Sequence, residues 1–265
     1  MLKIRIASAL IGLSLLLAAV LISKETLVAA VLVLSVAAVH EFYNAVSKAG
    51  YKPARWVGYL SSVIVLITGF TEGKDLLFIA VAIIMVIIFS LPVFFRKKYN
   101  TADIAMTIYG IFLTVFMFLF IILIRELKDG VYHVWIVFIG AWATDTFAYF
   151  GGITLGKRKL IPSISPNKTV EGAISGVIGA VAAIALYGFL IGQRISHVPY
   201  YNYIIMGMLC GIISQVGDLA ASAIKRNTGI KDYGSIMPGH GGILDRFDSV
   251  LLLCPLIYAY LYFLL

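Results

Sequence analysis

The stretch LLFIAVAIIMVIIFSLPVFF, residues 76–95, decides the fold class of this protein of 265 residues. It contains no charged residue, but Asp75 precedes it and the basic run Arg96–Lys98 follows it. An uninterrupted apolar helix of about 20 residues crosses the roughly 30 Å hydrocarbon core of a bilayer. The stretch therefore predicts a transmembrane helix.

Comparable apolar runs recur along the whole chain. Apolar residues make up 61% of the sequence and charged residues 13%, against about 45–50% and about 25% in soluble domains. This composition excludes a soluble globular protein and a disordered chain. We predict an all-α, polytopic integral membrane protein with nine transmembrane helices. The predicted spans are residues 4–22, 26–46, 56–71, 76–95, 103–124, 131–150, 171–192, 202–223 and 247–265.

The basic residues predict the orientation of these spans. If the N-terminus is cytoplasmic, the inner segments hold 16 of the 21 Lys and Arg residues and the outer segments hold 5. Cytoplasmic loops are enriched in Lys and Arg, so we predict a cytoplasmic N-terminus and an external C-terminus in the cytoplasmic (inner) membrane. Topology also accounts for the net charge of +8, so a nucleic-acid partner is not expected. His133 and His197 would then be solvated in outer loops.

Two inner loops, residues 151–170 and 224–246, differ from the others. They are the longest connections, and both mix glycine, hydroxyl and basic residues. We expect residues 1–130, with the first five spans, to form a scaffold. Residues 131–265 would carry these two loops as cytoplasmic catalytic loops.

Four aspartates lie at the predicted cytoplasmic ends of spans six, eight and nine. An ionised side chain at the centre of a span costs about 2.5–3.5 kcal/mol, so such residues mark candidate functional sites. A divalent cation would relieve repulsion among the carboxylates, and oxygen ligands favour magnesium or manganese over zinc. Ion pairs with nearby Lys and Arg residues are the alternative, and spacing alone leaves both open. The four residues are Asp145, Asp218, Asp245 and Asp248.

Basic and glycine-rich segments adjoin these aspartates. The run KRNTGIKDYGSIMPGHGGILDRFD, residues 225–248, supplies cations for phosphate oxygens and glycines that let backbone amides approach a ligand. In the other loop, Ser165 and Pro166 predict a helix start that could receive an anion, and Lys168 follows. His240 could be a general base, a phosphate ligand or a hydrogen-bonding loop residue. Metal-assisted phosphoryl or nucleotidyl transfer is the leading class of function.

Glu41 is a further ionisable residue at the inner end of a predicted span. Its H-E-x-x sequence does not continue to a second histidine, because residue 44 is Asn44, so a zinc-protease motif is excluded. We expect a structural partner for a nearby polar group, with support of the site as the alternative.

The residues of both loops resemble a known family, the phosphatidate cytidylyltransferases or CDP-diacylglycerol synthases. Its C-terminal signature is similar to a run of about 27 residues here, and its second cytoplasmic motif is similar to residues 145–172. The chain departs from the family pattern at Asn167, Ala221 and Tyr233, which puts one phosphate contact, one accessory carboxylate and the local loop shape in question. The matching signature residues are Ser222, Lys225, Arg226, Lys231, Asp232, Pro238, His240, Gly241, Gly242, Asp245, Arg246 and Asp248.

The resemblance implies that CTP and phosphatidate react to give CDP-diacylglycerol and pyrophosphate, with Mg²⁺ as cofactor and a second cation left open. It implies a metal site at Asp218, Asp245 and Asp248, joined by Asp145. The implied catalytic residues are Asp218, Asp245, Asp248, Lys225 and His240. The implied phosphate-binding residues are Ser165, Lys168, Arg226, Lys231, Arg246, Gly241 and Gly242.

Two alternative functions remain. Another membrane head-group transferase would use a CDP-lipid, but its D-x-x-D-G-x-x-A-R run is absent, since Ser249 follows Asp248. A cation-coupled transporter would place its charges near the bilayer midplane, whereas these carboxylates cluster at one predicted surface. Membrane lipid is an expected partner in every case, and a homodimer remains open.

Overall fold

The computed structural model describes residues 2–71, 74–192, 194–195, 198–239 and 241–264. The predicted site residue His240 and the predicted solvated residue His197 lie outside the described residues. The chain divides into two compact units, which we describe separately. Unit 1 is Met1–Leu123 with Lys225–Phe247, and unit 2 is Ile124–Ile224 with Asp248–Leu265.

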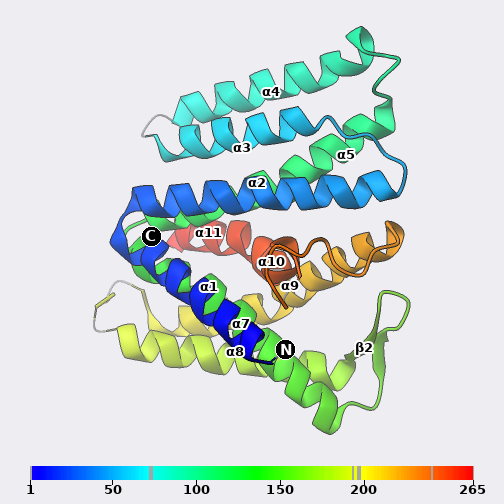
Figure 1. The fold of residues 1–265 in the computed structure, drawn as a ribbon. Helices are drawn as coiled ribbons and strands as arrows, with labels where there is room; N and C mark the ends of the chain where they lie inside the picture. The colour runs from blue at the N-terminus through cyan, green and yellow to red at the C-terminus, as the bar shows by residue number, and fades with distance from the viewer. Residues whose placement is uncertain (1, 72–73, 193, 196–197, 240, 265) are drawn as a thin grey trace. The chain divides into compact units, whose positions relative to one another are not determined.

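Unit 1 is built from neighbouring apolar helices, and Figure 1 shows α2, α3 and α4 lying side by side. Two of its helices begin with a capping box: the side chains of Ser23 and Asn100 accept the backbone N–H of Thr26 and Asp103. A loop from Thr228 to Ile243 belongs to this unit as well. The helices are α1 (Leu2–Ile22), α2 (Lys24–Lys48), α3 (Arg55–Phe70), α4 (Lys74–Phe94), α5 (Thr101–Ile111), the π-helical segment η1 (Phe112–Phe116) and α6 (Met117–Glu126), with the end of α6 from Ile124 onward in unit 2.

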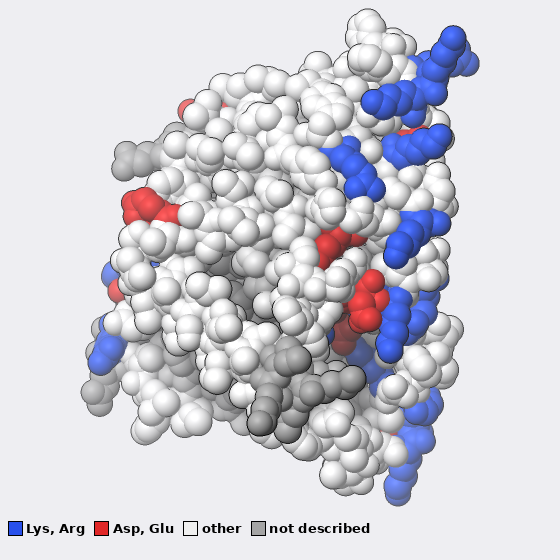
Figure 2. All heavy atoms as spheres, viewed as in Figure 1, with Lys and Arg blue, Asp and Glu red and all other residues white. Residues whose placement is uncertain are grey.

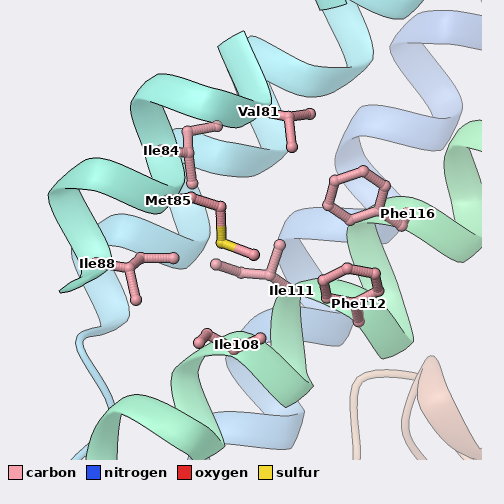
Figure 3. Close-up of a pocket in the computed structure, with 8 residues that line it drawn as sticks. All are labelled: Val81, Ile84, Met85, Ile88, Ile108, Ile111, Phe112 and Phe116. Carbon is pink, nitrogen blue, oxygen red and sulfur yellow. The ribbon is translucent and has the colours of Figure 1, made fainter. Parts of the chain in front are cut away.

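The π-helical segment η1 continues α5 without a break. Figure 3 shows Met85 and Ile88 of α4 facing Ile111 and Phe112 of α5 and η1 across a small apolar gap. The gap measures about 10 Å³, which leaves room for about one water molecule. It is therefore a feature of packing and is too small for a substrate.

Unit 2 contains two closely packed helices, α7 and α8, joined by a short β-hairpin. A Cβ at Gly172 would lie 2.8 Å from the carbonyl oxygen of Ala148, and one at Gly176 would lie 3.0 Å from that of Thr144. Small residues of this kind let membrane helices approach closely. The elements are α7 (Gly130–Leu155), β1 (Lys159–Ile161), β2 (Ser165–Thr169), α8 (Val170–Ile191), α9 (Tyr200–Asn227), α10 (Leu244–Leu251) and α11 (Leu253–Leu264), with the last turn of α9 and the start of α10 in unit 1.

The helices confirm a helical, polytopic membrane protein. Among the described residues, seven helical segments are long and apolar enough to cross a bilayer. Two shorter apolar helices, Ile6–Ile22 and Arg55–Phe70, correspond to the first and third predicted spans. The seven segments are Lys24–Lys48, Asp75–Phe94, Thr101–Glu126, Gly130–Leu155, Val170–Ile191, Tyr200–Asn227 and Leu244–Leu264.

The predicted helix start at Ser165 and Pro166 is wrong. Both residues belong to β2, which pairs antiparallel with β1 through the partners Lys159 and Thr169. Helix α8 begins only at Val170, and the Thr169 side chain caps it by accepting the N–H of Gly172 at 3.1 Å. The hairpin is also the one β-sheet in the described part of the chain, and an isolated β-bridge joins Met237 and Gly241.

Three other local predictions need correction. Helix α9 continues to Asn227, so Lys225 and Arg226 are helical residues and not loop residues. Helix α10 begins at Leu244, which shortens the predicted loop at its other end. His133, expected to be solvated, is fully buried within α7.

Candidate active site

An ion pair between Asp218 and Lys168 is the central polar contact of unit 2. Asp218 comes from α9, and Lys168 comes from β2. Each side chain is 26% exposed, so solvent or a ligand can reach the pair. The hydroxyl of Ser222, one turn further along α9, donates to Oδ1 of Asp218 at 3.4 Å. The structure thus brings together a residue predicted to bind metal and one predicted to bind phosphate.

The ion pair lines a cavity of about 530 Å³, which is within the usual range of roughly 300–1,000 Å³ for small-molecule sites. Asp145 enters it from α7, so two of the four predicted metal ligands share one cavity. Helices α7, α8 and α9 and the hairpin all contribute to its wall. The other lining residues are Ala148, Tyr149, Gly152, Ile153, Leu160, Asn167, Thr169, Gly172, Ala173 and Gln215.

The hairpin that carries Lys168 is held by Glu171, in the first turn of α8. Its Oε2 accepts the backbone N–H groups of Lys157 and Arg158 at 3.0 and 3.1 Å. Its Oε1 accepts from Nε of Arg158 at 3.1 Å. A carboxylate can accept about four hydrogen bonds, and Glu171 accepts three here, all from residues at one end of the hairpin. Lys168 therefore reaches the cavity from a hairpin that is held in place by hydrogen bonds to Glu171.

Asp145 is also linked to the C-terminal part of the unit. The hydroxyl of Ser249 donates to Oδ1 of Asp145 at 3.3 Å. The backbone N–H of Ser249 donates to Oδ1 of Asp248 at 2.8 Å. Asp145 and Asp248 therefore both contact Ser249, which places the two carboxylates in one hydrogen-bonded group.

The carboxylates of the cavity suit a magnesium site that uses few protein ligands better than a site in which the protein supplies every ligand. Among the described residues, no group of three or more His, Cys, Asp or Glu side chains is arranged to hold a metal ion. Magnesium commonly takes one or two carboxylates and completes its shell with water and substrate phosphates. Asp145 and Asp218, which line the same cavity, match that requirement.

Asp245 has a different environment, within unit 1. Its side chain is only 2% exposed, and Nζ of Lys225 lies 2.8 Å from Oδ1. Its Oδ2 accepts the backbone N–H groups of Tyr233 at 2.8 Å and Gly242 at 3.0 Å. The Lys225 ammonium also lies 5.4 Å from the centroid of the Tyr233 ring. Asp245 thus ties the loop to both flanking helices.

Glu41 of α2 binds the other side of the same loop. This buried carboxylate accepts the backbone N–H of Ile243 at 3.0 Å and that of Leu244 at 2.9 Å. These amides are at the start of α10, where helix N–H groups lack intrahelical partners. A Cβ at Gly242 would lie 2.5 Å from both Glu41 carboxylate oxygens, so only glycine allows this approach.

The remaining predicted site residues lie on or near these elements. Gly241 has a positive φ of 86°, in the left-handed region that favours glycine. Its carbonyl oxygen accepts the N–H of Met237 at 2.9 Å. The three other predicted phosphate-binding residues of unit 1 are exposed. They are Arg226, Lys231 and Arg246.

Comparison with known proteins decides the family. The sequence model of the cytidylyltransferase family matches residues 3–264. The chain belongs to the cytidylyltransferase family. The resemblance inferred from the two loops is thereby confirmed.

Several relatives of this cytidylyltransferase-family chain are named phosphatidate cytidylyltransferase. The protein of Bacillus subtilis (strain 168) is 44% identical over 149 residues, which cover 56% of this chain and 53% of the relative. That of Staphylococcus haemolyticus is 36% identical over 171 residues, 64% of each chain. That of Brucella abortus biovar 1 is 44% identical over 127 residues, 47% of this chain and 46% of the relative. The matched part spans about half to two thirds of the length of these relatives.

Glu41, expected from the sequence to be a structural partner for a nearby polar group, is such a partner for the N–H groups of Ile243 and Leu244. Gln215 of this family member was not predicted. It lines the cavity, and its amide donates to the carbonyl oxygens of Ala173 at 3.0 Å and Gly211 at 2.7 Å. Gln215 is a polar residue within an apolar helix, and that is the signal that could have found it.

We expect Glu41→Gln to destabilise unit 1. The substitution replaces one acceptor oxygen by an amide donor, so one of the two buried N–H groups of α10 loses its partner, at a cost of about 1–3 kcal/mol. Unfolding of the purified protein in detergent, followed by circular dichroism, measures the change. Asp232→Asn, at an exposed carboxylate of unit 1 outside any helix, is the matched control and should unfold as wild type does. Equal stability of the two variants would contradict the capping role.

Proposed function

We propose that the protein transfers the cytidylyl group of CTP to phosphatidate and releases CDP-diacylglycerol and pyrophosphate. The observation that carries this proposal is the cavity of unit 2, in which Asp145, Asp218 and Lys168 meet between apolar helices. A charged site of this kind suits a lipid phosphate and a nucleoside triphosphate. The family match over residues 3–264 and the names of the relatives support the same reaction.

The proposed step needs no covalent intermediate on the protein. An oxygen of the phosphatidate phosphate attacks the α-phosphorus of CTP, the new P–O bond forms, and the bond to the β-phosphate oxygen breaks with its electron pair leaving on pyrophosphate. Lys168 would bind phosphate oxygens, and its pairing with Asp218 holds the ammonium in the cavity. Bringing two polyanions together and neutralising the leaving group would supply most of the catalysis.

Magnesium would be held by Asp145 and Asp218, with Asp248 as the further ligand proposed within unit 2. When bound, it supplies positive charge that stabilises the pyrophosphate leaving group. Asp245 is also a proposed ligand. Asp218 and Asp245 would each have to exchange a paired lysine for the metal, Lys168 at Oδ2 of Asp218 and Lys225 at Oδ1 of Asp245. A second cation is left open.

The loop of unit 1 is proposed to bind substrate phosphates through its exposed basic residues and its glycine-flanked turn. Residues 1–130 would serve as scaffold, and the catalytic loops would lie in residues 131–265. The proposed set is Lys225, Arg226, Lys231, His240, Gly241, Gly242 and Arg246, with Ser165 from the hairpin of unit 2.

We further propose nine spans, a cytoplasmic N-terminus and an active site that faces the cytoplasm from the inner membrane. Cysteine labelling tests this topology, because the native thiols Cys210 and Cys254 are buried. In spheroplasts, Lys24→Cys should react with an impermeant maleimide at once, and Lys159→Cys only after permeabilisation. Labelling of Lys159→Cys in sealed spheroplasts would reverse the orientation and remove the access of the site to cytoplasmic CTP.

The reaction itself is tested with the purified protein in detergent, supplied with CTP, phosphatidate and magnesium. We expect CDP-diacylglycerol and pyrophosphate in equal amounts, and neither product when diacylglycerol replaces phosphatidate or EDTA removes the cation. A head-group transferase would instead consume a CDP-lipid and release CMP. A wild-type protein that forms no CDP-lipid would overturn the proposal.

A further inference from the structure

A second charged cavity, of about 720 Å³, lies within unit 1 between the α2–α3 and α4–α5 connections. Lys52, Arg55 and Lys98 line it, and no Asp or Glu is among its described lining residues. Figure 2 shows blue side chains gathered at this end of unit 1. The nearby carboxylate of Asp103 is buried and accepts the backbone N–H groups of Lys52 at 2.6 Å and Asn100 at 3.0 Å. The cavity therefore presents a net positive surface.

The cations combine one fixed group with two that reach solvent. Nη1 of Arg55 donates to Oδ1 of Asn44 at 2.6 Å, and Nη2 donates to Oγ of Ser47 at 3.1 Å. These bonds hold the guanidinium at the cavity wall. Lys52 and Lys98 are exposed, so their long side chains can adjust to an anion. An anchored guanidinium beside two exposed ammonium groups suits a phosphate, which accepts several charge-assisted hydrogen bonds.

An apolar stripe of α3 runs from this cavity along the helix. It begins at Trp56, which lines the cavity and is 48% exposed, and continues through Leu60, Val63 and Ile67 at helical spacing. From Trp56 to Ile67 the helix rises by about 16 Å, close to the roughly 15 Å depth of one leaflet of hydrocarbon. Aromatic residues such as Trp56 are typical of the head-group level. The stripe thus matches the length of a lipid acyl chain.

We propose that this cavity binds the head group of an anionic phospholipid, with its phosphate among Lys52, Arg55 and Lys98 and an acyl chain along the α3 stripe. All of these residues belong to unit 1, and none lines the cavity that contains Asp218. The inference therefore does not rest on the proposed enzyme activity. Basic pockets at the cytoplasmic ends of membrane helices are known to attract anionic head groups.

The test compares full-length wild type with the double variant Lys52→Gln/Lys98→Gln, each purified in a neutral detergent. Native mass spectrometry measures the binding of phosphatidylglycerol and phosphatidylcholine at matched concentrations. One basic residue close to an anionic lipid contributes about a fivefold gain in affinity, so the double variant should bind phosphatidylglycerol about 25-fold more weakly. Lys24→Gln/Lys128→Gln, at two exposed lysines outside the cavity, is the matched control and should bind as wild type does.

Three outcomes would overturn the proposal. Equal binding of phosphatidylglycerol by wild type and the Lys52→Gln/Lys98→Gln variant would exclude these lysines. Competition by inorganic phosphate or glycerophosphoglycerol as strong as that by the intact lipid would assign the cavity to a soluble phosphate and exclude the acyl contact. If wild type shows a dimer mass but no bound lipid, and the Lys52→Gln/Lys98→Gln variant shows only the monomer, the face would bind a second copy of the chain. Melting curves in detergent confirm that each variant is folded.

Discussion

Asp218→Asn is expected to lower kcat/KM for CDP-diacylglycerol formation by about a hundredfold to a thousandfold, since loss of one preorganised electrostatic contact to a transition state commonly costs about 10²–10³ in rate. The substitution removes the charge that pairs with Lys168 and an oxygen proposed to bind magnesium. Lys168→Gln removes the other half of the pair and should also reduce the rate severely. Production of radiolabelled CDP-lipid by purified variants in mixed micelles is the measurement.

The matched control for this prediction is Asp75→Asn. Asp75 is an exposed carboxylate in the first turn of α4, in unit 1, so its loss should leave the rate unchanged. Asp218 is itself 26% exposed, so its substitution should not unfold the protein. An Asp218→Asn variant with more than about a tenth of wild-type activity would remove Asp218 from the site.

Lys225→Met is expected to lower the free energy of unfolding by about 3–5 kcal/mol, because breaking a buried ion pair leaves an uncompensated charge. The charge in question is Asp245, whose side chain is 2% exposed and lies 2.8 Å from Nζ of Lys225. Methionine keeps the length of the lysine stem, so the change isolates the charge. Chemical or thermal unfolding in detergent measures the loss.

Two further variants distinguish the effect of leaving Asp245 unpaired from the effect of replacing any lysine in this part of the chain. Lys231→Met changes an exposed lysine of the same loop and should have no effect on stability. In the double variant Lys225→Met/Asp245→Asn the charge is gone and the asparagine oxygen can still accept from Tyr233 and Gly242, so it should be more stable than Lys225→Met alone. A double variant no more stable than the single variant would show that the buried charge is not the cause.

The sequence predicts the helices well because a bilayer leaves few options for an apolar segment. Backbone groups in hydrocarbon must bond within the segment, so a run such as residues 76–95 has to be helical. The hairpin was missed for the opposite reason. Outside the apolar runs, Ser165 and Pro166 suit a helix start and a strand equally, and pairing with β1 decides between them. His133 was misassigned although it lies inside the predicted span 131–150: its polar ring favoured a solvated position, whereas the structure buries it in α7.

The candidate site was predictable in composition but not in its contacts. The four aspartates and the basic loops stand out in the sequence, because charge is rare in this chain. Their pairing does not follow from spacing: Lys168 and Asp218 are 50 residues apart, and each had been given a separate role. Glu41 contacts Leu244, 203 positions along the chain, and no local pattern specifies that contact.

The central claim is that CTP binds and reacts in the cavity of unit 2. Photocrosslinking of a photoreactive CTP analogue to purified wild type, followed by mass spectrometry of the labelled peptides, tests it most directly. We predict labels on residues 145–173 or 215–218, which line that cavity, and their disappearance with excess CTP. Labels on residues 225–246 would agree with the proposed phosphate contacts of that loop. CTP-sensitive labels that fall only outside both regions, such as at the cavity beside Lys52 and Lys98, would contradict the claim.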